Sequence, residues 1–286
     1  MLSHIDIIGI AALIAVLFII YATLVEPYRV QVSRLEIPIE NLPTEFDGFT
    51  ICQLSDMHLS RYGRLEKKVG ELLSSLEYNT CVLTGDLTNT PEGLDAFHLI
   101  IDSTHASLGI FAVPGNGEYR LGLPIEEVAA EWEKMGITPL INSCAVLSRR
   151  GAKLSIIGVG DPFTECDDIE KATSGIEAGS NSVLLAHSPD ILMRLGDFRP
   201  DLILAGHTHG GQVRLPCLPP LWLHCRHRLG ISNGLYDPAE LSRRSGVDMR
   251  GVRMYVSRGI SATFPRLRFF CPPELVIITL ASVSDA

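Results

Sequence analysis

The sequence lacks the cysteine spacings that mark several classes of small protein. None of its seven cysteines forms a Cys-x-x-Cys pair, and Cys217 and Cys225 are eight positions apart, which matches no common structural zinc site. Internal repeats and low-complexity tracts are also missing. An odd, scattered set of cysteines is typical of reduced thiols, which favours a domain that faces the cytosol.

An excess of positive charge is lacking as well. The 286 residues carry 24 Lys and Arg against 33 Asp and Glu, a formal net charge of −9 at pH 7. A general nucleic-acid-binding protein normally presents a basic face, so this balance argues against nucleic acid as a partner. Hydrophobic residues make up 46% of the chain and charged residues 20%, which indicates a globular protein rather than a disordered one.

One long stretch has no charge at all. Residues 7–25 read IIGIAALIAVLFIIYATLV. At about 1.5 Å per residue, a helix of this length comes close to the thickness of the hydrocarbon core of a bilayer. A cleaved signal peptide is the alternative. However, no Lys or Arg precedes the stretch and no small-x-small site directly ends it, so we expect a retained anchor.

The charges around this stretch predict its orientation. Arg29 and Arg34 follow it, and the positive-inside rule then places the rest of the chain in the cytosol. We therefore predict that residues 1–29 form a single-pass anchor in the cytoplasmic (inner) membrane. Residues 30–286 are predicted to form one cytosolic domain.

Past residue 29, strand-like apolar runs alternate with helical patterns. Leucines and a valine between residues 65 and 76 recur on one helical face, which predicts a helix packed on a sheet. A weaker pattern predicts a helix over 93–103, and Pro124 and Gly136 mark the start and end of another over 124–136. This alternation of buried strand, polar loop and helix predicts an α/β fold. The runs that predict strands are 30–37, 49–54, 81–84, 110–113, 154–159, 182–186, 201–205, 253–257 and 275–280.

Five of the loops that follow these strands carry side chains of the metal-ligand type. Taken singly, such residues often belong to ordinary turns, because Gly-Asp and Gly-Asn are common turn dipeptides. As an ordered set they should meet, since the carboxyl ends of strands in α/β sheets line one crevice. His98, which lies on a predicted helix, is interpreted as structural. The candidate ligands are Asp56, His58, Asp86, Asn116, His187, His207 and His209.

The chemistry of this set predicts two metal ions. A mixture of carboxylate, imidazole and amide suits a borderline divalent ion, and we expect Mn, with Fe, Zn, Ni or Co as alternatives. Seven ligands are too many for one ion but suit two if one carboxylate bridges them. Two ions about 3.5–4 Å apart stabilise the attacking and leaving oxygens of an in-line displacement and supply a bridging hydroxide at neutral pH.

These motifs resemble those of the calcineurin-like metallophosphoesterases, which run D-x-H, G-D, G-N-H-(D/E), H and G-H-x-H. Residues 210–216, GGQVRLP, with 256–259 and 273–275, resemble the membrane-anchored bacterial branch that includes UDP-2,3-diacylglucosamine hydrolase-type enzymes. In this chain the family motifs stand as Asp56-Met57-His58, Gly85-Asp86, Gly115-Asn116-Gly117-Glu118, His187 and Gly206-His207-Thr208-His209.

The resemblance implies a fold, a ligand set and an activity. The fold is a two-sheet β-sandwich flanked by helices. One ion would be held by Asp56, His58, Asp86 and His209. The other would be held by Asp86, Asn116, His187 and His207, with Asp86 as the bridge. Asn116 and His187 are the candidate catalytic residues. The implied activity is hydrolysis of a phosphoric ester or anhydride.

One position departs from the family pattern. The family usually has a His after Gly-Asn that contacts the phosphate and helps to protonate the leaving group, and this chain has Gly117. Three interpretations stay open. The substrate has a good leaving group; Glu118, Tyr119, Arg120 or a water substitutes for the His; or the site binds metals with little activity. The first favours a phosphodiesterase or pyrophosphatase over a protein phosphatase.

Two segments mix aromatic and basic residues. These are LPPLWL at 218–223, which precedes the basic residues at 226–228, and RLRFF at 266–270. Each alone reads as a proline-containing loop or an ordinary strand, but beside an anchor both would suit an anionic lipid headgroup. Arg120, Trp222 and Arg226 are the candidate substrate contacts.

The anchor and these segments together suggest a membrane lipid or a lipid-linked nucleotide as the substrate. The specific candidate is UDP-2,3-diacylglucosamine, a precursor of lipid A. The alternatives are a general membrane-bound phosphodiesterase and a weakly active metal-binding scaffold.

Overall fold

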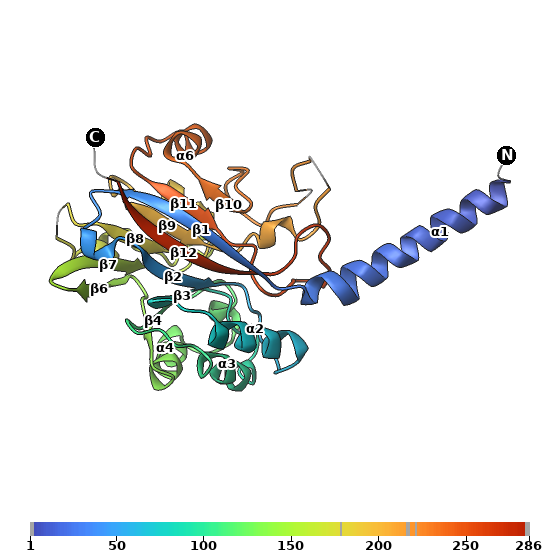
Figure 1. Ribbon diagram of the computed structural model, residues 1–286, viewed down its shortest axis with the longest axis horizontal. Coiled ribbons are helices and arrows are strands. Elements are labelled where there is room, and N and C mark those ends of the chain that lie inside the picture. The colour runs from blue at the N-terminus through green and yellow to red at the C-terminus, as the bar shows by residue number, and fades with distance from the viewer. Residues whose placement is uncertain (1–2, 178, 216–217, 221, 284–286) are drawn as a thin grey trace.

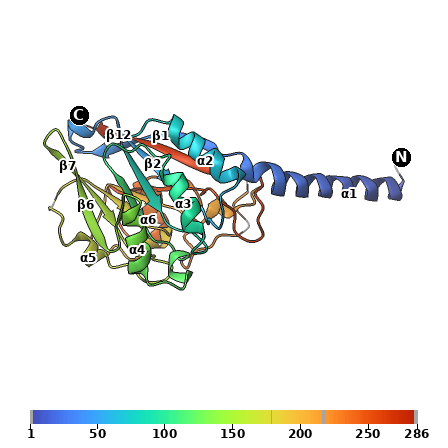
Figure 2. The same cartoon turned by 90° about the horizontal axis from the view of Figure 1, so that it is seen from below.

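A computed structural model describes residues 3–177, 179–215, 218–220 and 222–283. Pro216, Cys217 and Leu221, which belong to segments singled out above, lie outside the described residues. Two six-stranded sheets face each other, and helices cover their outer faces (Figure 1). A long N-terminal helix projects from one end of this sandwich (Figures 1 and 2). The predicted two-sheet sandwich with flanking helices and an N-terminal apolar helix is confirmed.

The first sheet has the strand order β1-β12-β2-β3-β4-β5, and strands β2 to β5 run parallel. Its central strands are mostly apolar and almost completely buried, as expected for strands that are covered on both faces. Three helices cover its outer face: α2 (Arg64–Ser75), α3 (Gly93–Ile101) and α4 (Ile125–Lys134). The strands are β1 (Gln31–Glu40), β2 (Phe49–Leu54), β3 (Thr80–Thr84), β4 (Ile110–Val113), β5 (Ile137–Pro139) and β12 (Glu274–Val283).

The second sheet has the order β10-β11-β9-β8-β7-β6, and β7, β8, β9 and β11 run parallel. Helices α5 (Ile169–Thr173) and α6 (Pro238–Ser245) lie on its outer side. The strands are β6 (Ser143–Arg149), β7 (Ala152–Gly158), β8 (Ser182–Leu185), β9 (Leu202–Ala205), β10 (Gly234–Tyr236) and β11 (Arg253–Val256).

Apolar side chains from both sheets fill the space between them. Ile51, Val82 and Phe111 of the first sheet meet Val183 and Leu202 of the second in one buried cluster. This arrangement holds the two sheets face to face and fixes the ends of their strands relative to each other.

A polar contact joins the sheets near these ends. The side chain of Gln53 is buried, and its Nε2 donates to Thr84 Oγ1 (3.1 Å) and to the carbonyl oxygen of Ala205 (3.0 Å). Since Thr84 and Ala205 are the last residues of β3 and β9, this side chain ties together two strand ends from opposite sheets.

The N-terminal helix α1 (His4–Ile20) continues through a π-helical turn (Tyr21–Val25) and a 3₁₀ turn (Glu26–Tyr28). The stretch Asp6–Tyr28 is long and apolar enough to cross a membrane. Most of its side chains are exposed, but Ala22 and Glu26 are buried against the domain. The helix end therefore packs on the domain.

Packing of α4 on the first sheet yields a test of the core. Trp132 is fully buried there, so Trp132→Ala should lower the free energy of unfolding by about 3–5 kcal/mol. Urea denaturation of detergent-solubilised protein measures this change. Glu133→Ala, at an exposed position on the same helix, should change it by less than about 0.5 kcal/mol. Equal effects would contradict the packing described.

Candidate metal centre

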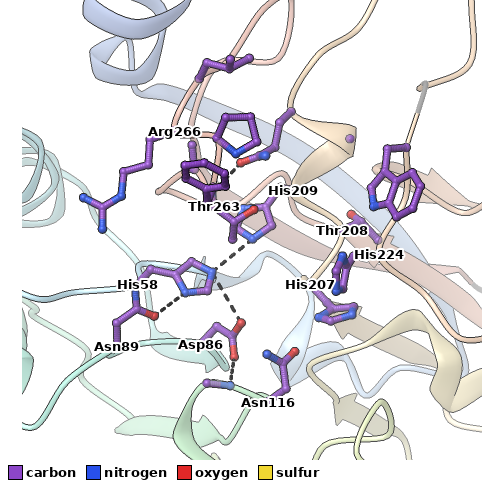
Figure 3. Close-up of a pocket in the computed structure, with 18 of the residues that line it drawn as sticks. His58, Asp86, Asn89, Asn116, His207, Thr208, His209, His224, Thr263 and Arg266 are labelled. Carbon is purple, nitrogen blue, oxygen red and sulfur yellow. Dashed lines mark hydrogen bonds and ion pairs between the residues drawn. The ribbon is translucent and has the colours of Figure 1, made fainter. Parts of the chain in front are cut away.

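The seven candidate ligands all follow strands that end at the same edge of the sandwich. Asp56 and His58 follow β2, Asp86 follows β3 and Asn116 follows β4 of the first sheet. In the second sheet, His187 follows β8, and His207 and His209 follow β9. The sheets face each other, so the loops of both sheets meet around one cavity (Figure 3).

Six of these residues form two groups. In each group, one potential ligand atom per residue lies within 4.8 Å of the others. The groups are Asp56, His58 and His209, and Asp86, His187 and His207.

Asp86 reaches both groups. Its Oδ2 lies 3.5 Å from His58 Nε2 and 3.4 Å from His187 Nε2. This is the position that a bridging carboxylate requires.

The polar atoms of the site fit divalent cations. His58 Nε2 lies 3.2 Å from His209 Nε2, and His187 Nε2 lies 3.0 Å from His207 Nδ1. His58 and His209 each have an acceptor at Nδ1, so with the ring protons there their facing Nε2 atoms point lone pairs at each other, which an ion between them would relieve. His207 Nε2 and Asn116 Oδ1 are also buried without a partner among the described residues. Imidazole, carboxylate and amide donors together suit borderline divalent ions.

Burial would lower the pKa of His187, but the nearby Asp86, Asp56 and Asp161 outweigh it and raise that pKa, so without an ion this imidazole takes up a proton that metal binding would displace. Other groups of the site already favour their metal-binding forms. Burial lowers the pKa of His209 to about 4, and burial with the nearby His187 holds the pKa of His207 well below its usual range. Burial would raise the pKa of Asp86, but His187 and His58 outweigh it and lower that pKa. Neutral imidazole and ionised carboxylate are the forms that bind metals.

Three histidines are oriented by acceptors behind them. His187 Nδ1 lies 2.8 Å from the carbonyl oxygen of Thr84, and His209 Nδ1 lies 3.1 Å from that of Ser261. His58 Nδ1 lies 2.8 Å from Asn89 Oδ1. These acceptors place the ring proton on Nδ1, so that Nε2 presents its lone pair to the centre.

The backbone of the site is strained. Five of the seven candidate ligands have positive φ angles, between +47° and +69°. Such angles cost free energy in residues other than glycine and are retained where the surroundings impose them, often at functional sites. The loop of His207 is also closely packed: a Cβ on Gly206 would lie 1.9 Å from Ser55 Oγ. The five are Asp56, His58, Asp86, His207 and His209.

Glu118 holds the loop that carries Asp86 through hydrogen bonds to its backbone. Its buried carboxylate accepts hydrogen bonds from the backbone N–H groups of Asp86, Leu87, Thr88 and Gly115, at 2.7–3.1 Å. Burial and the nearby Asp86 raise its pKa to about 7. Because these N–H groups occupy its oxygens, Glu118 supports the loop and does not line the cavity.

Gly117 packs directly on the candidate bridge. Its N–H donates to Asp86 Oδ1 at 2.6 Å, and a Cβ added to it would lie 2.9 Å from that oxygen. Of the residues considered as substitutes for the missing His, only Arg120 lines the cavity; Glu118 and Tyr119 do not. Position 117 is therefore packed for a residue without a side chain.

A cavity of about 860 Å³ opens over the centre. Arg120 and Trp222, two predicted substrate contacts, line it. The third, Arg226, does not: its guanidinium pairs with Glu165 and lies 5.9 Å from the ring centre of Phe163.

Two further polar residues of the wall were missed in the sequence. His224 lies 5.7 Å from His207, ring centre to ring centre, and Arg266 lies across the cavity (Figure 3). The only signal for them was the mixed aromatic and basic composition of their segments. His98 lies on α3 and pairs with Asp102 (3.2 Å), outside this centre.

The contact behind His58 yields a test. Asn89→Ala removes the acceptor at Nδ1 and should lower metal affinity about 10- to 100-fold, because outer partners fix the orientation of a ligating imidazole. Isothermal titration with Mn²⁺ measures the affinity. Asn233→Ala, which removes a partner of Arg214 outside the centre, is the control and should leave it unchanged. Unaltered binding in Asn89→Ala would contradict this role.

Comparisons with known proteins agree with this geometry. Residues 49–211 match the family model of the calcineurin-like phosphoesterases. The chain is 30% identical over 318 residues to the UDP-2,3-diacylglucosamine pyrophosphatase LpxG of Chlamydia trachomatis. This match covers 91% of the chain and 92% of LpxG. The chain is also 29% identical to the uncharacterized metallophosphoesterase YkuE of Bacillus subtilis (92% and 90%) and 28% identical to the phosphodiesterase YaeI of Escherichia coli (81% and 82%). The chain belongs to the calcineurin-like phosphoesterase family and is a metal-dependent phosphoester hydrolase.

Proposed function

We propose that this enzyme hydrolyses a phosphodiester or pyrophosphate bond at a centre of two divalent ions, with Mn²⁺ the first candidate. Asp56, His58 and His209 would hold one ion; Asn116, His187 and His207 would hold the other. Asp86 would bridge them. The observation that carries the proposal is the position of Asp86 Oδ2, within 3.5 Å of a histidine from each group.

The ions, when bound, supply positive charge for the phosphate oxygens and lower the pKa of a water nucleophile. Side chains around the centre then determine which substrates are oriented and which leaving groups can depart. Arg120 and Arg266 face the cavity and would orient an anionic group. Gly117 offers no acid to the leaving group, so a leaving phosphate, which needs no proton from the protein, is favoured over an alkoxide.

The reaction is tested with bis(4-nitrophenyl) phosphate and Mn²⁺. Asp86→Ala removes the shared carboxylate and should lower kcat by about 10³-fold, a loss of several kcal/mol of transition-state stabilisation. His98→Ala, which alters an exposed histidine outside the centre, should retain full activity. Failure of the wild-type enzyme with Mn, Ni, Co and Zn would favour the metal-binding scaffold instead.

The proposed substrate is a lipid-linked nucleotide, with UDP-2,3-diacylglucosamine the specific candidate. Three observations support this. The relative from Chlamydia trachomatis is named for that substrate, α1 is apolar enough to span a membrane, and the cavity joins a polar floor to apolar walls at Trp222, Phe264 and Leu267. Cleavage between the two phosphates releases UMP and needs no acid at position 117.

Release of UMP from UDP-2,3-diacylglucosamine by the Mn²⁺-loaded enzyme tests this substrate. We expect release at a rate well above that for bis(4-nitrophenyl) phosphate, and Asp86→Ala should abolish it. If simple diesters were cleaved and the lipid were not, the enzyme would be a general membrane-bound phosphodiesterase, as the name of the relative from Escherichia coli suggests.

The anchor is proposed to hold the domain on the cytosolic face of the membrane. Arg29 and Arg34, four and nine residues after Val25, support this orientation. A C-terminal fusion to alkaline phosphatase should therefore be inactive, and a fusion to green fluorescent protein should fluoresce. The reverse result would place the domain outside the cytoplasm.

A further inference from the structure

Large apolar side chains are exposed on two loops at the end of the domain from which α1 leaves. We call five of them the rim: Leu215 (42% exposed), Leu218 (52%), Trp222 (74%), Phe264 (94%) and Phe270 (58%). Single exposed apolar residues are ordinary, whereas several on adjoining loops mark a contact surface. The loops adjoin through a β-bridge between Val213 and Phe269.

These loops are fixed against the helix. The Phe269 ring lies 4.7 Å from that of Phe18 and 6.1 Å from that of Tyr21, centre to centre. The backbone N–H of Arg268 donates to the carbonyl oxygen of Ala22 (2.9 Å). In addition, the carboxylate of Glu26 accepts a hydrogen bond from the backbone N–H of Cys271 (2.5 Å). The loop of residues 257–273 therefore packs directly on the N-terminal helix, and the β-bridge between Val213 and Phe269 joins the other loop to it.

The contact with Phe18 indicates how deep the loops lie. Phe18 is seven residues before Val25, the last residue of the charge-free stretch. Seven residues of helix span about 10 Å. If this stretch fills the hydrocarbon core, Phe269 lies alongside its outer part. Figures 1 and 2 both show loops of the domain gathered around the base of α1.

The charges around the rim suit an anionic membrane surface. Segments 212–236 and 257–273 contain no Asp or Glu and six Arg, although the whole chain has a net charge of −9. Arg268 is buried, and Arg226 and Arg258 pair with Glu165 and Glu274 outside these segments. Arg228 and Arg266 are exposed. Apolar side chains flanked by arginines are the composition of segments that lie in the interface of anionic bilayers.

From these observations we propose that the rim is a second membrane contact, embedded at the boundary between headgroups and acyl chains of an anionic bilayer, and that the catalytic cavity opens there. Trp222 and Phe264 belong both to the rim and to the cavity wall. A lipid substrate would then present its phosphates to the centre while its acyl chains stay in the bilayer. This inference rests on the proposed membrane anchor and not on the proposed reaction.

The two tryptophans of the chain allow a direct test. Trp132 is fully buried and Trp222 is 74% exposed, so the Trp132→Phe variant reports on the rim alone. The full chain is placed in nanodiscs of phosphatidylcholine and phosphatidylglycerol. Lipids brominated near the headgroup should quench Trp222 emission by about half or more, since interfacial side chains lie roughly 5–10 Å deep. Lipids brominated near the chain ends should quench it less.

The control is Trp222→Phe, which retains only the buried Trp132 and should be quenched by neither lipid. If Trp132→Phe did not fold, the wild-type chain would give the same readout above a constant Trp132 signal. Emission unaffected by brominated lipid but quenched by aqueous acrylamide would overturn the proposal. The measurement needs no turnover, so quenching in a protein that hydrolyses nothing would refute only the proposed reaction.

Discussion

The carboxylate of Asp86 is the constraint on which the site depends. It is almost completely buried, and a second buried carboxylate, that of Glu118, lies beneath its loop. Two such groups are costly to remove from water unless positive charge and hydrogen-bond donors compensate them. Backbone N–H groups serve Glu118, and histidines surround Asp86. Cations between these histidines would complete the compensation, which gives the strained loops a physical reason to persist.

The two sheets make this arrangement possible. Neither sheet alone carries a full ligand set, because three strand ends of one sheet and two of the other contribute. The apolar layer between the sheets and the bridging side chain of Gln53 hold those ends in place. The chemistry therefore depends on packing some distance from the centre, and strained ligand loops can be supported by the rigid strands they follow.

Sequence patterns were sufficient for the elements with long apolar runs and for the ligands at their ends. They did not predict β5 and β10, which have only three residues each, or α5, which has one turn and a half. Helix α6 was not predicted either, since Leu241 is its single buried residue. The half-exposed strand β6 was missed because its neighbours, not its own sequence, define it. The sequence suggests Glu118 as an acid and not as an acceptor, because three of the four N–H groups that it accepts from belong to residues 30–32 positions away in sequence. His224 and Arg266 reach the cavity only through loop folding.

The central claim is that seven side chains bind two ions that share Asp86. The most direct measurement is the metal content of the purified full-length protein after loading with Mn²⁺ and removal of free ions. The account predicts two ions per chain in the wild type and fewer than one in Asp86→Ala, with His98→Ala retaining two. One ion in the wild type, or two in Asp86→Ala, would contradict it.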